Sequence, residues 1–291
     1  MVVGPLVYRF VSDFEIEVDG SYAHFFHEHL PVSDTDAKLK VVCEINVAEG
    51  EIPIDGQLVY HDTVNSVFVN AKGQETRVMT IEGKPYAVCR ESLNASLELI
   101  LSRACLSDGN ICISMPILEA LMMERFMVMC GGLILHSSFI IHEGEAILFT
   151  APSGTGKSTQ ASLWQRYAGA EIINGDRSVV WYDGQQFMAS GLPFCGSSGI
   201  NKDRTVPLAC IAFIEQWPDN NACSMPVAVS ARKLFGEMSI NKWNHQFVDL
   251  ALDMIERLVV SVPMVHLQCN MEEGAVTALR TYLAQSKGND G

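Results

Sequence analysis

The segment from Glu145 to Tyr167 restricts the possible folds of this chain most, because it has the pattern of a strand, a glycine-rich loop and a helix in immediate succession. The apolar run Ile147-Leu148-Phe149 is typical of a buried strand. Ala151 to Thr159 follows as Ala-Pro-Ser-Gly-Thr-Gly-Lys-Ser-Thr, and a helix is expected from there onward. A strand that enters a helix through a glycine loop is the local structure of a phosphate-binding loop, and it predicts an α/β fold.

The residue types of this loop suit the triphosphate of a nucleotide. Gly154 and Gly156 allow the backbone to turn so that successive N–H groups point inward, and the helix N-terminus adds partial positive charge there. Lys157 would reach the β- and γ-phosphates, and Ser158 would offer its hydroxyl to Mg²⁺. The usual pattern begins with glycine where this chain has Ala151, and the alternative is a glycine-rich turn without a ligand. We expect nucleotide contacts from seven residues, namely Ser153, Gly154, Thr155, Gly156, Lys157, Ser158 and Thr159.

The pattern of strands and helices divides the chain in two. At about 150 residues per domain, 291 residues make one large domain or two ordinary ones. Residues 1–90 predict a smaller β-rich N-terminal domain, and residues 91–291 predict an α/β domain with a mixed sheet. The second part has apolar spacing typical of helices over 93–104 and 114–130. Further strands are expected at 133–141, 145–150, 171–174, 178–181, 207–215 and 262–269, and helices at 158–167, 231–238, 245–258 and 272–284.

Composition excludes several classes of protein. With 20 Lys and Arg against 34 Asp and Glu, the formal net charge is −14, so the chain lacks the basic surface of a general nucleic-acid binder. Its longest uncharged apolar stretch, Phe126–Leu135, has ten residues, whereas a membrane-spanning helix needs about 20. We therefore expect no membrane partner. The nine cysteines are scattered singly with no CxxC pair, and the N-terminus lacks a signal-peptide pattern, which predicts a cytoplasmic protein with reduced thiols.

Four polar residues outside the loop are candidates for chemistry. Asp176 follows a short apolar strand nineteen residues after Lys157 and would be the carboxylate ligand of Mg²⁺; the alternative is a residue of a turn. His136 lies on the strand before the loop, where the alternative is a hydrogen-bonded core histidine. Lys202 and Arg204 lie in a polar loop that could bring a cation to the γ-phosphate; the alternative is a solvated charged loop.

These segments together resemble a known family. Leu135-His136-Ser137, the glycine loop and Asn174-Gly175-Asp176-Arg177 are similar to segments of the HPr kinase/phosphorylase family, whose P-loop core is shared with phosphoenolpyruvate carboxykinases. The closer resemblance is to HPr-kinase-related proteins of peptide biosynthesis, among them the lasso-peptide kinases and the SynChlorMet cassette proteins. Gly191-Leu192-Pro193-Phe194 and the apolar strand at 207–216 fit that subgroup, and the resemblance covers residues 115–285.

The resemblance implies a kinase that uses ATP and Mg²⁺ and phosphorylates a hydroxyl, such as a Ser, of a peptide or protein. In the family a His precedes the loop Lys by twenty-one residues, as His136 precedes Lys157. The catalytic candidates are therefore Lys157, Asp176, His136 and Arg204, with Ser158 and Asp176 as metal ligands. No Glu-x-Arg-Gly element occurs near residues 194–200, which argues against HPr as the substrate and against phosphorylase activity.

One departure from the family pattern keeps alternatives open. The family has two Asp residues before an Arg, and the first is assigned as the base, but this chain has Gly175-Asp176 before Arg177. Asp176 could serve both roles, His136 could assist, or catalysis could be lost. The rival function is accordingly a non-catalytic nucleotide sensor or partner protein in a biosynthetic cluster. A carboxykinase-like lyase is disfavoured by the short chain.

The sequence leaves open the identity of the ligands, the oligomeric state and the role of three histidines near the N-terminus. The nucleotide base and the phosphate acceptor do not follow from the sequence. HPr kinases are hexameric, but their N-terminal domain differs from this one, so a homo-oligomer stays an open alternative. His24, His27 and His29 lack the spacing that places two metal ligands on one helical face, so packing or surface roles are preferred over a metal site.

Overall fold

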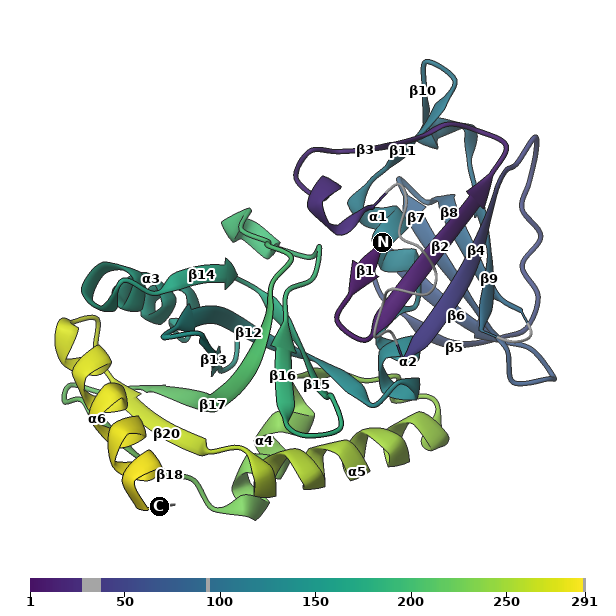
Figure 1. The fold of residues 1–291 in the computed structure, drawn as a ribbon. Coiled ribbons are helices and arrows are strands. Elements are labelled where there is room, and N and C mark those ends of the chain that lie inside the picture. The colour runs from purple at the N-terminus through teal and green to yellow at the C-terminus, as the bar shows by residue number, and fades with distance from the viewer. Residues whose placement is uncertain (28–37, 93–94, 290–291) are drawn as a thin grey trace. The chain divides into compact units, whose positions relative to one another are not determined.

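A computed structural model describes residues 1–27, 38–92 and 95–289, which form two compact units (Figure 1). The first unit is Met1–Cys130 with Asn241–His245, and the second is Gly131–Ile240 with the described residues from Gln246 onward. The division therefore lies after residue 130, whereas the strand and helix patterns suggested one near residue 90. The reason is that the first helix after residue 90, Met115–Ala120, packs on the strands Glu75–Ile81 and Lys84–Glu91 of the first unit.

The first unit is built on a mixed sheet of eight strands in the order β1-β2-β4-β9-β8-β7-β6-β5. A sheet of three short strands and two short helices complete it. The strands are β1 (Val2–Val3), β2 (Leu6–Ser12), β3 (Ile16–Val18), β4 (Leu39–Val47), β5 (Gln57–His61), β6 (Asn65–Val69), β7 (Glu75–Ile81), β8 (Lys84–Glu91), β9 (Ser96–Leu101), β10 (Leu106–Ser107) and β11 (Asn110–Ile113). The α-helices are α1 (Met115–Ala120) and α2 (Met123–Met129), and single 3₁₀ turns are η1 (Ala23–Phe25) and η2 (Arg103–Cys105).

Two helix predictions for this part of the chain were wrong. The segment predicted as a helix over 93–104 contains β9 and the turn η2, and Leu93 lies outside the described residues. Leu97, Leu99 and Leu101 are buried alternately along β9, and a spacing of four residues fits this strand period as well as a helix. The helix predicted over 114–130 is two helices, because Met122 adopts a left-handed conformation with φ 53° between them.

A buried ion-pair network lies inside the first unit. The Glu75 side chain is fully buried, and its Oε1 accepts from Arg125 Nη1 at 2.6 Å and from Trp243 Nε1 at 3.1 Å. Asn241 Nδ2 donates to the other carboxylate oxygen at 3.2 Å, and Glu91 pairs with Arg125 at 2.7 Å. The segment 241–245 is thus tied to this unit by the buried carboxylate, although its neighbours in sequence belong to the second unit.

Arg125→Met should destabilise the protein by about 3–5 kcal/mol, because it leaves the buried Glu75 carboxylate without its cation. The free energy of unfolding in urea measures the effect. Arg103→Met is the matched control, since Arg103 and Glu49 form an ion pair with side chains 68% and 86% exposed, which should contribute less than about 1 kcal/mol. Equal losses in the two variants would contradict the prediction.

The second unit combines a nine-stranded sheet with four helices. In it β12, β13, β17, β16 and β15 pair in a closed ring, and β17 also pairs in parallel with β20. The strands are β12 (Gly132–His142), β13 (Glu145–Thr150), β14 (Glu171–Asn174), β15 (Arg177–Tyr182), β16 (Phe187–Ser190), β17 (Thr205–Gln216), β18 (Asn221–Ser224), β19 (Met238–Ser239) and β20 (Met264–Cys269). The helices are α3 (Lys157–Ala168), α4 (Val227–Glu237), α5 (His245–Ser261), α6 (Glu273–Asn289) and the 3₁₀ turn η3 (Gly196–Ser198). The mixed α/β class is confirmed.

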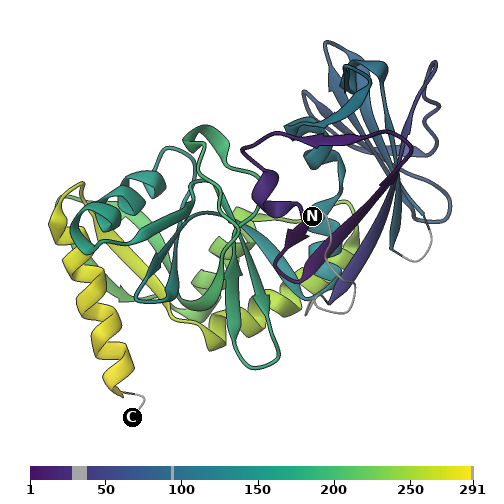
Figure 2. The ribbon, with the colours of Figure 1, turned by 45° about the horizontal axis from the view of Figure 1, so that its top comes forward.

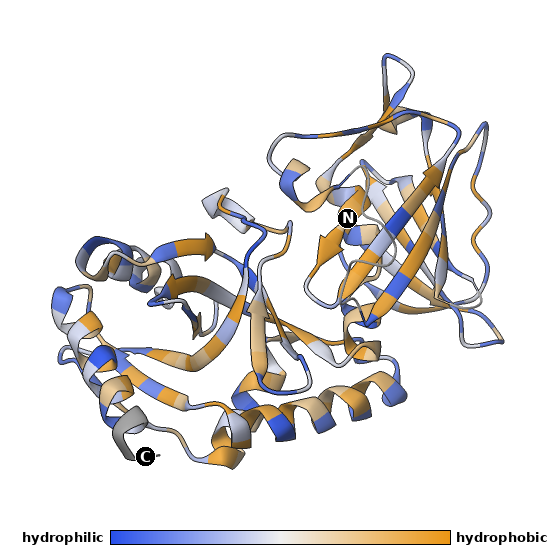
Figure 3. Ribbon diagram, in the orientation of Figure 1, coloured by the Kyte–Doolittle hydropathy of each residue, from blue (hydrophilic) through white to orange (hydrophobic). Residues whose placement is uncertain are grey.

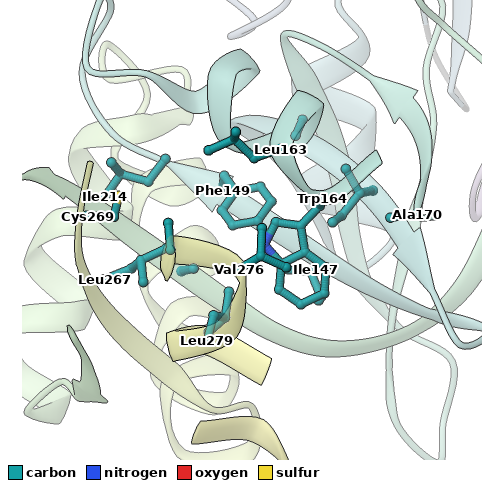
Figure 4. Close-up of a cluster of buried hydrophobic side chains, with 14 of the residues drawn as sticks. Ile147, Phe149, Leu163, Trp164, Ala170, Ile214, Leu267, Cys269, Val276 and Leu279 are labelled. Carbon is teal, nitrogen blue, oxygen red and sulfur yellow. The ribbon is translucent and has the colours of Figure 1, made fainter. Parts of the chain in front are cut away.

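Helices α3 and α6 pack beside each other and cover one face of this sheet, as both ribbon views show (Figures 1 and 2). Their core gathers around Trp164 and Phe149, which are fully buried (Figure 4). On β17, Ala212 and Ile214 belong to this core, so Phe213 points to the opposite face. Lys233 of α4 lies over the Phe213 ring, and α4 is therefore on that opposite face.

Helix α5 lies where a helix was predicted over 245–258, and it is amphipathic. Its buried residues include Phe247, Ala251, Met254 and Leu258, which recur every three or four positions. Figure 3 shows the same helix with apolar and polar residues in alternation along its length. Over the described residues, no helix combines the length and the apolar character needed to cross a membrane.

The nine cysteines are free thiols, and most are buried. Burial raises the pKa of Cys43 and of Cys130 to about 12. Thiols with such pKa values stay protonated at neutral pH and are poor nucleophiles. Cys43 and Cys130 are therefore packing residues.

Candidate functional site

The glycine loop between β13 and α3 has the backbone that its residues predicted. Gly154 and Gly156 have φ values of 79° and 112°, which favour glycine. Lys157 is the first residue of α3 and is only 7% exposed. Its Nζ donates to the carbonyls of Ala151 at 2.8 Å and Pro152 at 3.4 Å, so the ammonium group folds back across the mouth of the loop.

A second turn, after β14, holds Asp176 next to the loop. The side chain of Asn174 makes this turn, because its Oδ1 accepts from the backbone N–H groups of Asp176 at 2.9 Å and Arg177 at 3.0 Å. The Asn174 amide also donates to two backbone carbonyls of the segment 192–194, which fixes it in place. Ser137 N donates to the Asp176 carbonyl at 2.9 Å and ties the turn to β12.

His136 lies between two carboxylates. Its Nδ1 is 3.2 Å from Glu237 Oε2, and its Nε2 is 3.7 Å from Asp176 Oδ1. The strand register explains the first contact: Met238 pairs with Leu135 in the antiparallel ladder of β19 and β12, so Glu237 comes opposite His136. No sequence pattern pointed to Glu237, because it is 101 residues from His136 and lies at the end of a helix.

The carboxylates of Glu237 and Asp176 affect the pKa of Lys157. Burial lowers the pKa of Lys157, while the nearby carboxylates of Glu237 and Asp176 act in the opposite direction. Ser158 Oγ lies 3.5 Å from the Gly175 carbonyl, at the turn that carries Asp176. The structure therefore brings together four predicted residues, Lys157, Ser158, Asp176 and His136, and adds the carboxylate of Glu237.

Arg204 is not brought into this group. A bridge joins Asn174 to Asn201 in antiparallel fashion, so the chain that follows Asn201 runs back toward the start of β14. There Arg204 Nη1 pairs with Glu171 Oε2 at 3.2 Å and Lys202 Nζ pairs with Glu171 Oε1 at 2.9 Å. The cations of the predicted loop thus contact a carboxylate at the far end of β14.

The side chain of Ser198 occupies the space beside Gly175, the position at which the HPr kinase pattern has its first Asp. A Cβ built on Gly175 would stand 2.3 Å from Ser198 Oγ and 2.5 Å from its Cβ. Ser198 is held there, because its hydroxyl donates to the Cys195 carbonyl at 2.7 Å and accepts from Ile200 N at 3.2 Å. Restoring an Asp at position 175 therefore requires a change at Ser198 as well.

Gly175→Ala should destabilise the protein by about 1–3 kcal/mol through this overlap. Adding Ser198→Gly should recover most of the loss, as measured by urea denaturation. Gly236→Ala is the matched control, since nothing lies within 4 Å of its added Cβ, and alanine in a helix should stabilise by about 0.5–1 kcal/mol. If Gly175→Ala were as stable as the wild type, Ser198 would not define this position.

A cavity of about 480 Å³ adjoins the other side of the glycine loop. It is lined by loop residues 153–155, by Glu215 and its neighbours at the end of β17, by Lys233 of α4 and by His266 of β20. His266 Nε2 lies 2.7 Å from Glu215 Oε2. No sequence pattern singled out Glu215, Lys233 or His266, because each comes from a different element. The only available signal for Glu215 was its place at the end of an apolar strand.

The histidine cluster near the N-terminus gives no metal site among the residues that the structure describes. There, no group of three or more His, Cys, Asp or Glu side chains is placed to hold a metal ion. The His24 ring packs 4.6 Å from the Phe25 ring, and His29 lies outside the described residues.

Comparisons with known proteins confirm the predicted resemblance to the SynChlorMet cassette proteins through a family model. The structure search finds the HPr(Ser) kinase/phosphatase of Coxiella burnetii, at 11% identity and a TM-score of 0.30, covering 53% of this chain and 98% of that one. No match was found among curated proteins. The family model of the SynChlorMet cassette protein ScmC matches residues 107–272, which is more than half of the 291 residues. The chain therefore belongs to the SynChlorMet cassette protein ScmC family.

Proposed function

We propose that this protein is a Mg-ATP-dependent kinase that transfers the γ-phosphate to a hydroxyl, such as a Ser, of a peptide or protein in a peptide-modification pathway. The observation that carries the proposal is the convergence of Lys157 in the glycine loop with Asp176 and His136. A cation for phosphate, a carboxylate for metal and a base next to both are the parts that phosphoryl transfer uses. The proposed fold is a P-loop core of the HPr kinase and carboxykinase type, contained in the second unit.

The residues present fit Mg-ATP. The positive φ values of Gly154 and Gly156 and the start of α3 at Lys157 supply the backbone that cradles phosphates. Ser158 and Asp176 would hold Mg²⁺, since the Ser158 hydroxyl of α3 lies 3.5 Å from the carbonyl of Gly175, the residue before Asp176. One or two protein ligands suffice, because phosphate oxygens and water complete the shell of magnesium at a nucleotide. When bound, the ion neutralises charge on the phosphates.

His136 is the group best placed to take the proton of the acceptor hydroxyl. If its Nδ1–H donates to Glu237, its Nε2 keeps a free electron pair on the side of Asp176. The hydroxyl proton moves to Nε2 as the oxygen attacks phosphorus, and ADP leaves with the bridging oxygen. Glu237 orients the imidazole and stabilises its charged form. In this scheme the missing Asp at position 175 is replaced by His136, while Asp176 remains a metal ligand.

The remaining assignments are proposals of the same kind. The β-rich first unit would be a separate domain. A cytoplasmic location fits nine free thiols. The partners would be the nucleotide and the acceptor peptide or protein, without nucleic acid. Arg204 keeps a catalytic role only if it exchanges Glu171 for the γ-phosphate.

A non-catalytic nucleotide sensor is the second candidate, and Gly175 favours it, since the family base is absent there. One experiment separates the two functions. The protein is incubated with γ-labelled ATP, Mg²⁺ and Ser-containing peptides encoded beside its gene, and label on the peptide is measured. Transfer that depends on Mg²⁺ supports the kinase. Tight ATP binding by calorimetry without transfer to any of these peptides supports the sensor.

A further inference from the structure

The cavity next to residues 153–155 lies on the opposite side of the glycine loop from His136 and its two neighbouring carboxylates. Strand β13, which leads into the loop, has two neighbours: Thr150 pairs with Ser137 of β12 on one side and with Phe213 of β17 on the other. His136 precedes Ser137, whereas the cavity is lined by the residues that follow Phe213. The base and the cavity therefore flank the phosphate loop.

In-line phosphoryl transfer requires the acceptor and the leaving nucleotide to lie on opposite sides of the transferred phosphate. The attacking and the leaving oxygen stand on opposite sides of the transferred phosphorus. An acceptor hydroxyl must approach on the side of His136, where the base lies. The rest of the nucleotide must then extend to the other side. A volume of about 480 Å³ is in the range of small-molecule sites.

We propose that this cavity binds the nucleoside part of the nucleotide and that Glu215 accepts hydrogen bonds from the ribose hydroxyls. The inference rests on the proposed function, because it takes the nucleotide as given and assigns its position. It names a recognition site that the phosphate loop alone does not provide.

Glu215 has the geometry of a prepared acceptor. Its Oε2 accepts hydrogen bonds from His266 Nε2 at 2.7 Å and from Gln268 Nε2 at 3.2 Å. Its Oε1 has no hydrogen-bond partner within the described part of the chain. These two hydrogen bonds lower the pKa of Glu215, with His266 as the larger cause, so the carboxylate is ionised. An ionised carboxylate accepts and does not donate, which suits the neighbouring hydroxyls of a ribose.

The distance between the phosphate loop and Glu215 is also fixed. Gln216 Nε2 donates to the Thr155 carbonyl at 3.2 Å and ties the end of β17 to the loop. Lys233 adds a positive charge to the cavity from α4. The charge of Lys233 acts on Glu215 itself, so a ligand that joins a diol to phosphates can meet this carboxylate at one end and Lys157 of the loop at the other.

The test compares three ligands by calorimetry with Mg²⁺ present: ATP, 2′,3′-dideoxy-ATP and inorganic triphosphate. We expect the wild type to bind ATP about tenfold or more tightly than dideoxy-ATP, as hydrogen bonds to a charged group imply. Glu215→Ala should bind ATP and dideoxy-ATP equally and should keep the wild-type affinity for triphosphate. That affinity also reports that the phosphate loop of the variant is folded.

Glu171→Ala is the matched control, since Glu171 is an ion-paired carboxylate at the start of β14. It should keep the wild-type preference for ATP. Equal affinity of the wild type for ATP and dideoxy-ATP would overturn the inference, and so would a preference that survives in Glu215→Ala. Binding of triphosphate in those cases leaves the proposed function intact. A wild type that binds neither triphosphate nor ATP would instead overturn the proposed function.

Discussion

Lys157→Ala is expected to weaken binding of Mg-ATP by about 10- to 100-fold while the fold survives. The Lys157 side chain is buried beside the glycine loop, and its ammonium group donates hydrogen bonds to the carbonyls of Ala151 and Pro152. Phosphate oxygens would be stronger partners than these neutral carbonyls, because the hydrogen bonds would join opposite charges. Alanine removes them without changing the core around Trp164. Calorimetry with ATP and Mg²⁺ measures the change.

Lys202→Ala is the control for this prediction. Lys202 also pairs with a carboxylate, but it lies at the far end of β14 with a side chain 46% exposed. It should bind ATP as the wild type does. Unchanged affinity in Lys157→Ala, with thermal unfolding showing an intact fold, would remove the phosphate-loop assignment.

Asp176→Asn is expected to lower Mg²⁺-dependent phosphate transfer by about 10²–10⁴-fold. The amide keeps the shape of the side chain but loses the charge that would hold the metal, and it also removes one of the two carboxylates beside His136. Binding of ATP without metal should change little, since the loop backbone and Lys157 carry it. Steady-state transfer rates and metal-free calorimetry together test this difference.

Asp183→Asn is a suitable control, because Asp183 Oδ1 accepts from the backbone N–H groups of Gln185 and Gln186 in the β15–β16 turn. Asn serves such a turn as well as Asp does, so transfer should remain at the wild-type rate. If Asp176→Asn also transferred phosphate at that rate, Asp176 would be a residue of a turn and the metal carboxylate would lie elsewhere.

The local parts of the site could be predicted from the order of residues. The strand, the glycine loop and the helix over 145–168 follow from near neighbours in the chain, and the structure has them within a few residues of the prediction. The turn after β14 is equally local, since Asn174 bonds to residues two and three positions later. Patterns of this kind are set by backbone preferences and a few side chains, so they can be read from the order of residues.

Which distant residues lie beside these local parts follows from the pairing of strands and the packing of helices in the folded unit. The register of β19 on β12 places Glu237 at His136, and the bridge at Asn201 carries Arg204 toward Glu171 and away from the loop. The cavity beside the loop combines Glu215, Lys233 and His266 from three separate elements. The physical reason is that strand register and the packing of helices depend on burial over the whole unit, so the spacing of residues within one segment does not fix them.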